Sequence, residues 1–192
     1  MTEEITHYSD LQIKYTPDSD IYLAHEYNID VKANHIYLFG DERYISSEDP
    51  GDPGVEYATA NMFVRNLNLL MRKSSNPILV HMKLSGGYED QGLAMYDLLK
   101  ACPNRVTILA YTDPSSMSSV VIQGADKRVL MPHAKYMFHC GDAIHEGTKK
   151  QVLTAAEELA KSERLIMDIY VQAMKRTGCY RHRSKQFIAA WL

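Results

Sequence analysis

The sequence predicts an α/β fold, in which parallel strands alternate with helices. Three strand-like segments, at 35–40, 76–84 and 105–111, are rich in apolar residues, and each is followed by a segment with helical spacing. Parallel strands need crossover connections, so we expect the intervening helices to join them with right-handed crossovers. A length of 192 residues suits one domain, or one domain with an appendage.

The first half of the chain divides at clear boundaries. The strand at 35–40 closes on a glycine, and residues 41–54 are rich in Asp, Gly and Pro, which predicts a loop. Apolar residues at helical spacing then predict a helix over 55–73. A buried strand is expected at 76–84, and a further helix at about 89–100.

The second half begins with the strand at 105–111, which leads through an Asp-Pro-Ser-Ser turn into a short apolar helix ending near Gln123. Two short strands, KRVLM and KYMFH, are expected on either side of Pro132. From about residue 148 the pattern is helical to about 176, and Gly178 marks the expected end. The apolar stripe of this long helix suits either packing on its own domain or projection towards another subunit.

These elements divide the chain into three expected parts: an N-terminal arm or hairpin over 1–33, a head over 34–147, and a long helix with a basic segment over 148–192. The basic residues between 175 and 185 are interpreted as a solvated face, in preference to a nucleic-acid contact. The formal net charge of −3 argues against a general nucleic-acid binder.

Composition excludes several other classes of protein. The three cysteines form no CxxC pair, so neither a disulfide framework nor a zinc site is indicated, and a reducing cytoplasm fits. The histidines are not spaced as metal ligands, so we expect no metal and no cofactor. The polar, acidic N-terminus is unlike a signal peptide. No apolar run approaches the roughly 18 residues that a membrane span requires.

Ser85-Gly86-Gly87 lies between the end of a strand and the start of a helix. Glycines at such a corner leave backbone N–H groups pointing into open space, where they can bind an oxyanion or a phosphate. Neither GxGxxG nor GxxxxGK[ST] is present, so a nucleotide-binding loop is not indicated. The alternative interpretation is a simple tight turn.

Ser116 opens the short helix after the strand at 105–111. Its hydroxyl suits either an N-cap or the tip of a strand–turn–helix corner, where it would be free to attack a carbonyl. His139, at the end of KYMFH, suits either a structural role or that of general base to a nearby serine. Local sequence does not choose among the neighbouring serines, which are Ser115, Ser116, Ser118 and Ser119.

Three ordered blocks, LSGGYEDQGLAMYDLLK, SSM and GADKRVLMPHAKYMFH, resemble the Clp protease proteolytic subunit family. HIYLFGDE also looks like the first core strand of that family. The serine of the second block stands at the family's separation from the glycine pair. The matching residues are Gly86, Gly87, Gly92, Tyr96 and Asp97, then Ser116 and Met117, then Gly124, Lys127, Arg128, Pro132, Met137 and His139.

The resemblance implies a serine endopeptidase that acts through an acyl-enzyme. Ser116 would be the nucleophile and His139 the general base, with the N–H groups of Gly87 and Met117 as the oxyanion hole. It implies a spiral of β-β-α units related to the crotonases, with a long helix that joins rings. It also implies polypeptide substrates, a homo-oligomeric ring of one heptamer or two stacked heptamers, and a hexameric AAA+ ATPase as partner.

The sequence departs from the family pattern in three places. Leu84-Ser85 stands where the family has a proline before the glycines, and Thr112-Asp113-Pro114 replaces small residues before the nucleophile. The third triad acid is not identified. Residues 171–192 contain no carboxylate, and the sequence stops before the family's closing strand. Neither Asp142 nor Asp168 occupies the family position, so neither is assigned.

Two alternative functions follow from these observations. The missing acid and the altered turn favour a catalytically weak or inactive ring subunit with a structural or regulatory role. A crotonase-like acyl-CoA enzyme would share the fold and the oxyanion hole, but it would leave Ser116 and His139 unexplained.

Overall fold

A five-stranded sheet forms the centre of the molecule in the computed structural model, which describes residues 20–40, 54–139, 144–176 and 179–191. The strands follow one another in sheet order, and β1 pairs antiparallel with β2 while β2 to β5 run parallel. The parallel arrangement confirms the predicted α/β fold. The strands are β1 Ile29–Asp30, β2 His35–Phe39, β3 Ile78–Lys83, β4 Val106–Ala110 and β5 Lys127–Leu130.

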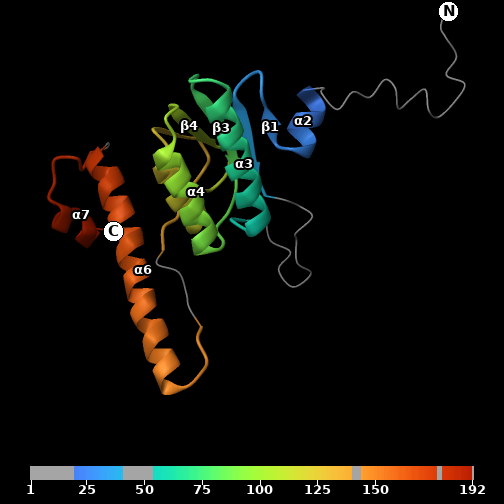
Figure 1. The fold of residues 1–192 in the computed structure, drawn as a ribbon. Coiled ribbons are helices and arrows are strands. Elements are labelled where there is room, and N and C mark those ends of the chain that lie inside the picture. Colours follow the sequence, from blue (N-terminus) through green and yellow to red (C-terminus); the bar gives the residue numbers. More distant parts are fainter. Residues whose placement is uncertain (1–19, 41–53, 140–143, 177–178, 192) are drawn as a thin grey trace, which may run out of the picture.

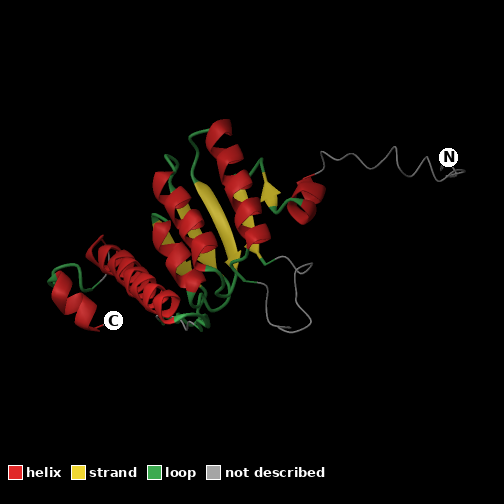
Figure 2. Cartoon of the chain, turned by 60° about the horizontal axis from the view of Figure 1, so that its bottom comes forward, coloured by secondary structure: helices red, strands yellow, loops and turns green. Residues whose placement is uncertain are grey.

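Helices follow the strands in the order that the sequence predicts. α3 and α4 lie side by side over one face of the sheet, and α5 packs against α4 (Figures 1 and 2). The helices of the head are α3 Tyr57–Lys73, α4 Glu89–Ala101, α5 Met117–Val121 and the 3₁₀ turn η2 Ile122–Gly124. A further helix, α2 Asp20–Glu26, was not foreseen and lies in the segment expected to be an arm or hairpin.

The hydrophobic core lies between this helical layer and the sheet. Alternate residues of each central strand are buried, as expected when one face of a strand packs against helices. The helices contribute the apolar stripe that their spacing predicts. The core includes Ile36, Leu38, Val80, Met82 and Ile108 from the strands and Phe63, Leu67, Leu70 and Met95 from the helices.

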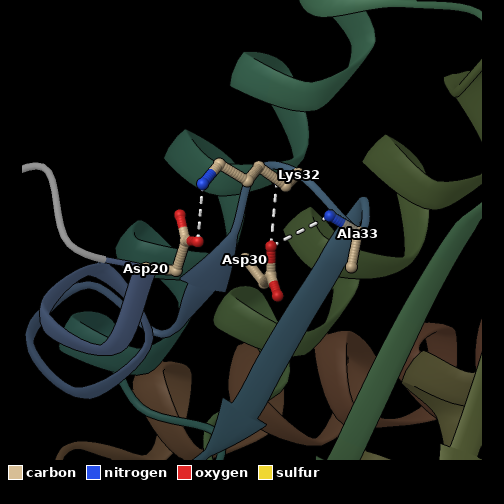
Figure 3. A network of polar contacts seen from close by, with 4 residues as sticks. All are labelled: Asp20, Asp30, Lys32 and Ala33. Carbon is tan, nitrogen blue, oxygen red and sulfur yellow. Dashed lines mark hydrogen bonds and ion pairs between the residues drawn. The ribbon is translucent and has the colours of Figure 1, made fainter.

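The turn between β1 and β2 is built around one aspartate (Figure 3). The Asp30 carboxylate accepts hydrogen bonds from the backbone N–H groups of Lys32 and Ala33, both at 2.9 Å. Lys32 Nζ also forms an exposed ion pair with Asp20 at 2.8 Å, which ties α2 to the turn. Such an exposed pair contributes little stability. Of the predicted arm or hairpin over 1–33, residues 1–19 lie outside the described residues.

The predicted long helix is α6, Lys149–Arg176. Its buried residues, Ile166, Ile169, Tyr170, Val171 and Ala173, all lie in its C-terminal half, which contacts α5 and η2. The N-terminal half extends beyond the head (Figure 1), and in it Leu153 is 55% and Leu159 37% exposed. The two interpretations of its apolar stripe therefore each describe one half of the helix. None of the described helices combines the length and the apolar character that crossing a membrane requires.

Two expectations were wrong at the level of elements. KYMFH forms no strand in the described residues; its only pairing there is an isolated bridge between Ser115 and Met137. A helix not foreseen from the sequence, α7 Lys185–Trp191, follows α6 and packs on it. Ser184 starts this helix, because its Oγ accepts the Phe187 N–H at 3.1 Å. Of the predicted 41–54 loop, 41–53 lie outside the described residues, as does Gly178.

Candidate active site

Ser116 occupies a sharp corner between β4 and α5. Its backbone angles are φ 51° and ψ −126°, a conformation that costs free energy for any residue with a Cβ. The side chain makes no capping hydrogen bond to α5, so the N-cap interpretation does not hold. The corner instead presents the hydroxyl at the carboxyl end of a central strand.

Two of the neighbouring serines have hydroxyls that are committed to other bonds. Ser118 and Ser119 are fully buried. Ser118 Oγ donates to the Ser115 carbonyl at 2.8 Å, and Ser119 Oγ donates to the Ser116 carbonyl at 2.6 Å. These two hydroxyls therefore hold the turn together, and they are not accessible to a substrate.

His139 lies directly beside Ser116. Its Nε2 is 2.8 Å from Ser116 Oγ. Two backbone bonds bring the two segments together: Ser116 N–H donates to the Met137 carbonyl, and Met137 N–H donates to the Pro114 carbonyl, each at 3.1 Å. When the hydroxyl donates to Nε2, the neutral imidazole must carry its proton on Nδ1. This arrangement lets His139 accept the hydroxyl proton.

The glycine pair lies against the same corner. A Cβ on Gly86 would stand 2.5 Å from the Cβ of Ser116, so only glycine fits without displacing the serine. Gly87 has φ +154°, and a Cβ there would meet the Val55 carbonyl oxygen at 2.2 Å. Val55 N–H donates to the Gly86 carbonyl, and Tyr88 N–H donates to the Val55 carbonyl, both at 2.8 Å. These contacts fix the glycine pair next to Ser116, and a simple tight turn would not need them.

The N–H groups of Gly87 and Met117 are the remaining elements of the predicted site. Within the described part of the chain, neither N–H donates to a backbone carbonyl. Met117 is buried, and its side chain packs on Gly92, where a Cβ would come within 2.5 Å of Met117 Cγ. This packing anchors the first residue of α5 directly after the serine.

No carboxylate among the described residues hydrogen-bonds to His139. Asp168 lies on α6 with an exposed side chain, and Asp142 lies outside the described residues. The third triad acid therefore stays unassigned. The described residues also contain no group of three or more His, Cys, Asp or Glu side chains that could hold a metal ion.

A buried polar network under the Ser116 corner was missed by the sequence analysis. It consists of Ser119, Gln123, Tyr136 and Tyr170. Burial raises the pKa of the Tyr170 hydroxyl, and burial of its hydroxyl end raises that of Tyr136, although 41% of Tyr136 as a whole is exposed. The sequence signal was the presence of tyrosines in otherwise apolar stripes. This pattern predicts that the rings are packed, but it does not predict the hydrogen-bond partners of their hydroxyl groups.

Comparison with known proteins places these residues in a family context. The family model for Clp protease matches residues 40–180. An ATP-dependent Clp protease proteolytic subunit of Deinococcus radiodurans is 32% identical over 121 residues, which cover 60% of this chain and 58% of the relative. The subunit of Pleurastrum terricola is 30% identical over 112 residues, 57% and 56% of the two chains. This chain thus spans less than two thirds of the length of these relatives.

A solved structure shows the same fold. A mutant of ClpP1 from Listeria monocytogenes superposes with a TM-score of 0.66, covering 88% of this chain and 82% of that one. The two sequences are 16% identical, so this likeness speaks for the fold alone. It confirms the predicted spiral α/β architecture with a long projecting helix.

Proposed function

The chain belongs to the Clp protease family, and from that premise we propose that it is a serine endopeptidase with Ser116 as nucleophile. The observation that carries this proposal is the 2.8 Å contact between Ser116 Oγ and His139 Nε2. A serine hydroxyl is a weak nucleophile unless a base within hydrogen-bond reach takes its proton. The strained backbone of Ser116 supports the same role, because such strain concentrates at functional sites.

In the proposed acylation, Ser116 Oγ attacks the carbonyl carbon of the scissile peptide bond while His139 Nε2 takes the hydroxyl proton. The carbonyl oxygen becomes an oxyanion, which the N–H groups of Gly87 and Met117 would stabilise. Collapse of the tetrahedral intermediate breaks the C–N bond, and the leaving amine takes the proton from His139. The product of this step is an acyl-enzyme on Ser116.

In the proposed deacylation, a water molecule replaces the amine. His139 takes one proton from the water as its oxygen attacks the ester carbonyl, and the same two N–H groups would bind the second oxyanion. The proton then returns to Ser116 Oγ as the ester bond breaks, releasing the carboxylic acid. Loss of one oxyanion donor typically slows such a reaction by about 10²–10³-fold.

The proposed substrates are unfolded polypeptides, and the proposed partners are further copies of this chain in a ring and a hexameric AAA+ ATPase. The relatives are named as ATP-dependent proteolytic subunits, which supports an ATPase partner. The exposed leucines on the projecting half of α6 support association between copies.

The proposed location is the cytoplasm. Cys102 and Cys179 are free thiols, which is consistent with a reducing cytoplasm.

Ser116→Ala tests the nucleophile. The wild-type chain is expected to react covalently with a fluorophosphonate probe, and Ser116→Ala is expected to remain unlabelled. Ser115→Ala is the matched control, because it removes a neighbouring hydroxyl and should label like wild type. His139→Ala should label at least about 100-fold more slowly.

Equal labelling of Ser116→Ala and wild type would exclude Ser116 as nucleophile. A wild-type chain that neither labels nor hydrolyses a casein or peptide substrate would favour the catalytically inactive ring subunit. The crotonase-like acyl-CoA enzyme is less favoured, because it gives no role to the Ser116–His139 contact.

A further inference from the structure

A chain of buried hydroxyl groups connects the long helix to the proposed nucleophile. Tyr170, on α6, is 4% exposed, and its OH lies 2.5 Å from Ser119 Oγ. Ser119 Oγ in turn lies 2.6 Å from the carbonyl oxygen of Ser116. Two hydrogen bonds thus separate α6 from the backbone of Ser116.

The direction of these bonds follows from their partners. The Ser116 carbonyl can only accept, so the single hydroxyl proton of Ser119 must point to it. Ser119 Oγ therefore accepts from Tyr170, and the tyrosine is the donor of the second bond. The Ser116 carbonyl also accepts the Ser119 N–H at 3.1 Å. Two donors thus hold the carbonyl of a residue whose own backbone is strained.

The same tyrosine also contacts the segment that carries the proposed base. The Tyr170 ring lies edge-on to Phe138, with 4.6 Å between ring centroids and an interplanar angle of 75°. Phe138 directly precedes His139. Tyr170 therefore touches the Ser116 corner through its hydroxyl and the histidine segment through its ring.

The other members of the network hold a different atom of Ser119, its backbone carbonyl. Tyr136 OH donates to the Ser119 carbonyl at 2.7 Å, and Gln123 Nε2 donates to Tyr136 OH at 2.7 Å and to the Ser119 carbonyl at 2.9 Å. These bonds fix the Ser119 backbone. Within this network, Tyr170 alone donates to the Ser119 hydroxyl that holds the Ser116 carbonyl.

We propose that Tyr170 is a positioning residue for the Ser116–His139 pair, so that seating of α6 on the head sets the geometry of the nucleophile. This inference rests on the proposed serine peptidase function. It assigns to the long helix a part in catalysis within its own chain. The observation behind this proposal is that the buried Tyr170 side chain contacts both Ser119 and Phe138.

Tyr170→Phe tests the proposal, because it removes the hydroxyl and keeps the ring against Phe138. The rate of fluorophosphonate labelling is resolved into probe affinity and the maximal rate of inactivation. The maximal rate should fall about ten-fold, as expected for loss of one buried hydrogen bond, while probe affinity and far-ultraviolet circular dichroism stay unchanged. Tyr96→Phe is the matched control, since it removes the hydroxyl of a half-buried tyrosine outside the network.

Ser119→Ala reaches the same bond from the other side. It should lower the maximal rate to a similar extent, and adding Tyr170→Phe to it should cause little further loss, because the two changes remove one shared connection. Unchanged inactivation rates in both variants, or loss of folding in both without a specific rate effect, would overturn the positioning role. Absence of Ser116-dependent labelling in the wild type would instead overturn the proposed function, and the role of Tyr170 with it.

Discussion

At the scale of single residues, the site depends on close approaches that few side chains permit. Gly86 is required because a Cβ would collide with Ser116, and Ser116 itself adopts a backbone conformation that is unfavourable outside glycine. The register of the family blocks pointed to Ser116 among four serines. The structure supplies a physical reason to set two of them aside, since Ser118 and Ser119 are buried and hydrogen-bonded.

His81 of β3 lies on the face of the sheet opposite the hydrophobic core, and it makes stability depend on pH. His81 Nδ1 is 2.8 Å from Tyr111 OH, and its Nε2 is 3.1 Å from His35 Nδ1. Burial, followed by the charge of His35, lowers the pKa of His81. The unfolded chain therefore binds a proton more readily than the folded chain, so stability falls as pH drops below the ordinary histidine value of about 6.5.

His81→Gln should reduce this loss of stability on acidification. The measurement is the urea midpoint of unfolding at pH values of about 7.5 and about 5, on either side of the ordinary histidine pKa. The wild type should lose more stability between the two values than the variant. The exposed His133→Gln variant is the control and should follow the wild type. Identical pH dependence in His81→Gln and wild type would contradict the assignment.

At the scale of elements, the helical layer shows how periodicity translates into burial. On α3, Leu67 is fully buried against the core, whereas Leu69 is 43% exposed. The two leucines differ by two positions, which places them on different faces of the helix. Strands have a period of two residues instead, so residues two positions apart share a face, and burial alternates along β3 and β4.

This difference predicts two unequal losses of stability. Leu67→Ala should lower the free energy of unfolding by about 2–5 kcal/mol, because it leaves a cavity in the core. Leu69→Ala on the same helix should lower it by about 0.5 kcal/mol or less. Urea denaturation of the two variants checks this. Equal effects would show that the exposed face of α3 is covered by something else in solution.

The two wrong expectations about elements, KYMFH and α7, have local explanations. Alternation in KYMFH predicted a strand, but Pro114 on the opposite segment has no N–H with which to continue the ladder. One bridge at Met137 is what results. For α7 the sequence does carry a signal, because Ser184 is a suitable N-cap just before an apolar run. Ile188 in that run is fully buried.

At the scale of the whole molecule, one apolar groove is left uncovered in a single chain. A groove of about 880 Å³ runs along the projecting half of α6 and reaches the start of α4. Apolar side chains including Ile144, Val152, Leu159 and Leu165 line it together with Glu89 and His145. Exposed apolar surface of this kind indicates association.

Val152→Lys should therefore weaken self-association. Val152 lines this groove and is 40% exposed on the projecting half of α6, so a lysine there would be solvated in the monomer and unfavourable in an apolar interface. Sedimentation velocity should show large assemblies for the wild type and a shift to smaller species for the variant. Lys161→Arg, which keeps the charge on the same half of the helix, is the control. A wild type that stays monomeric at all concentrations would contradict the proposed ring.

The sequence by itself determined the order of strands and helices from β2 to β5, the family, and the choice of Ser116 and His139 as the candidate nucleophile and base, because periodicity and ordered motifs are local properties of the chain. The tertiary structure decided which residues distant in the sequence come into contact. It brought Ser116 and His139 to 2.8 Å through two backbone bonds, and it split the stripe of α6 into a packed half and a projecting half. It also placed Tyr170 against Ser119, a contact between residues 51 positions apart. Such contacts depend on how elements pack, and no local pattern encodes them.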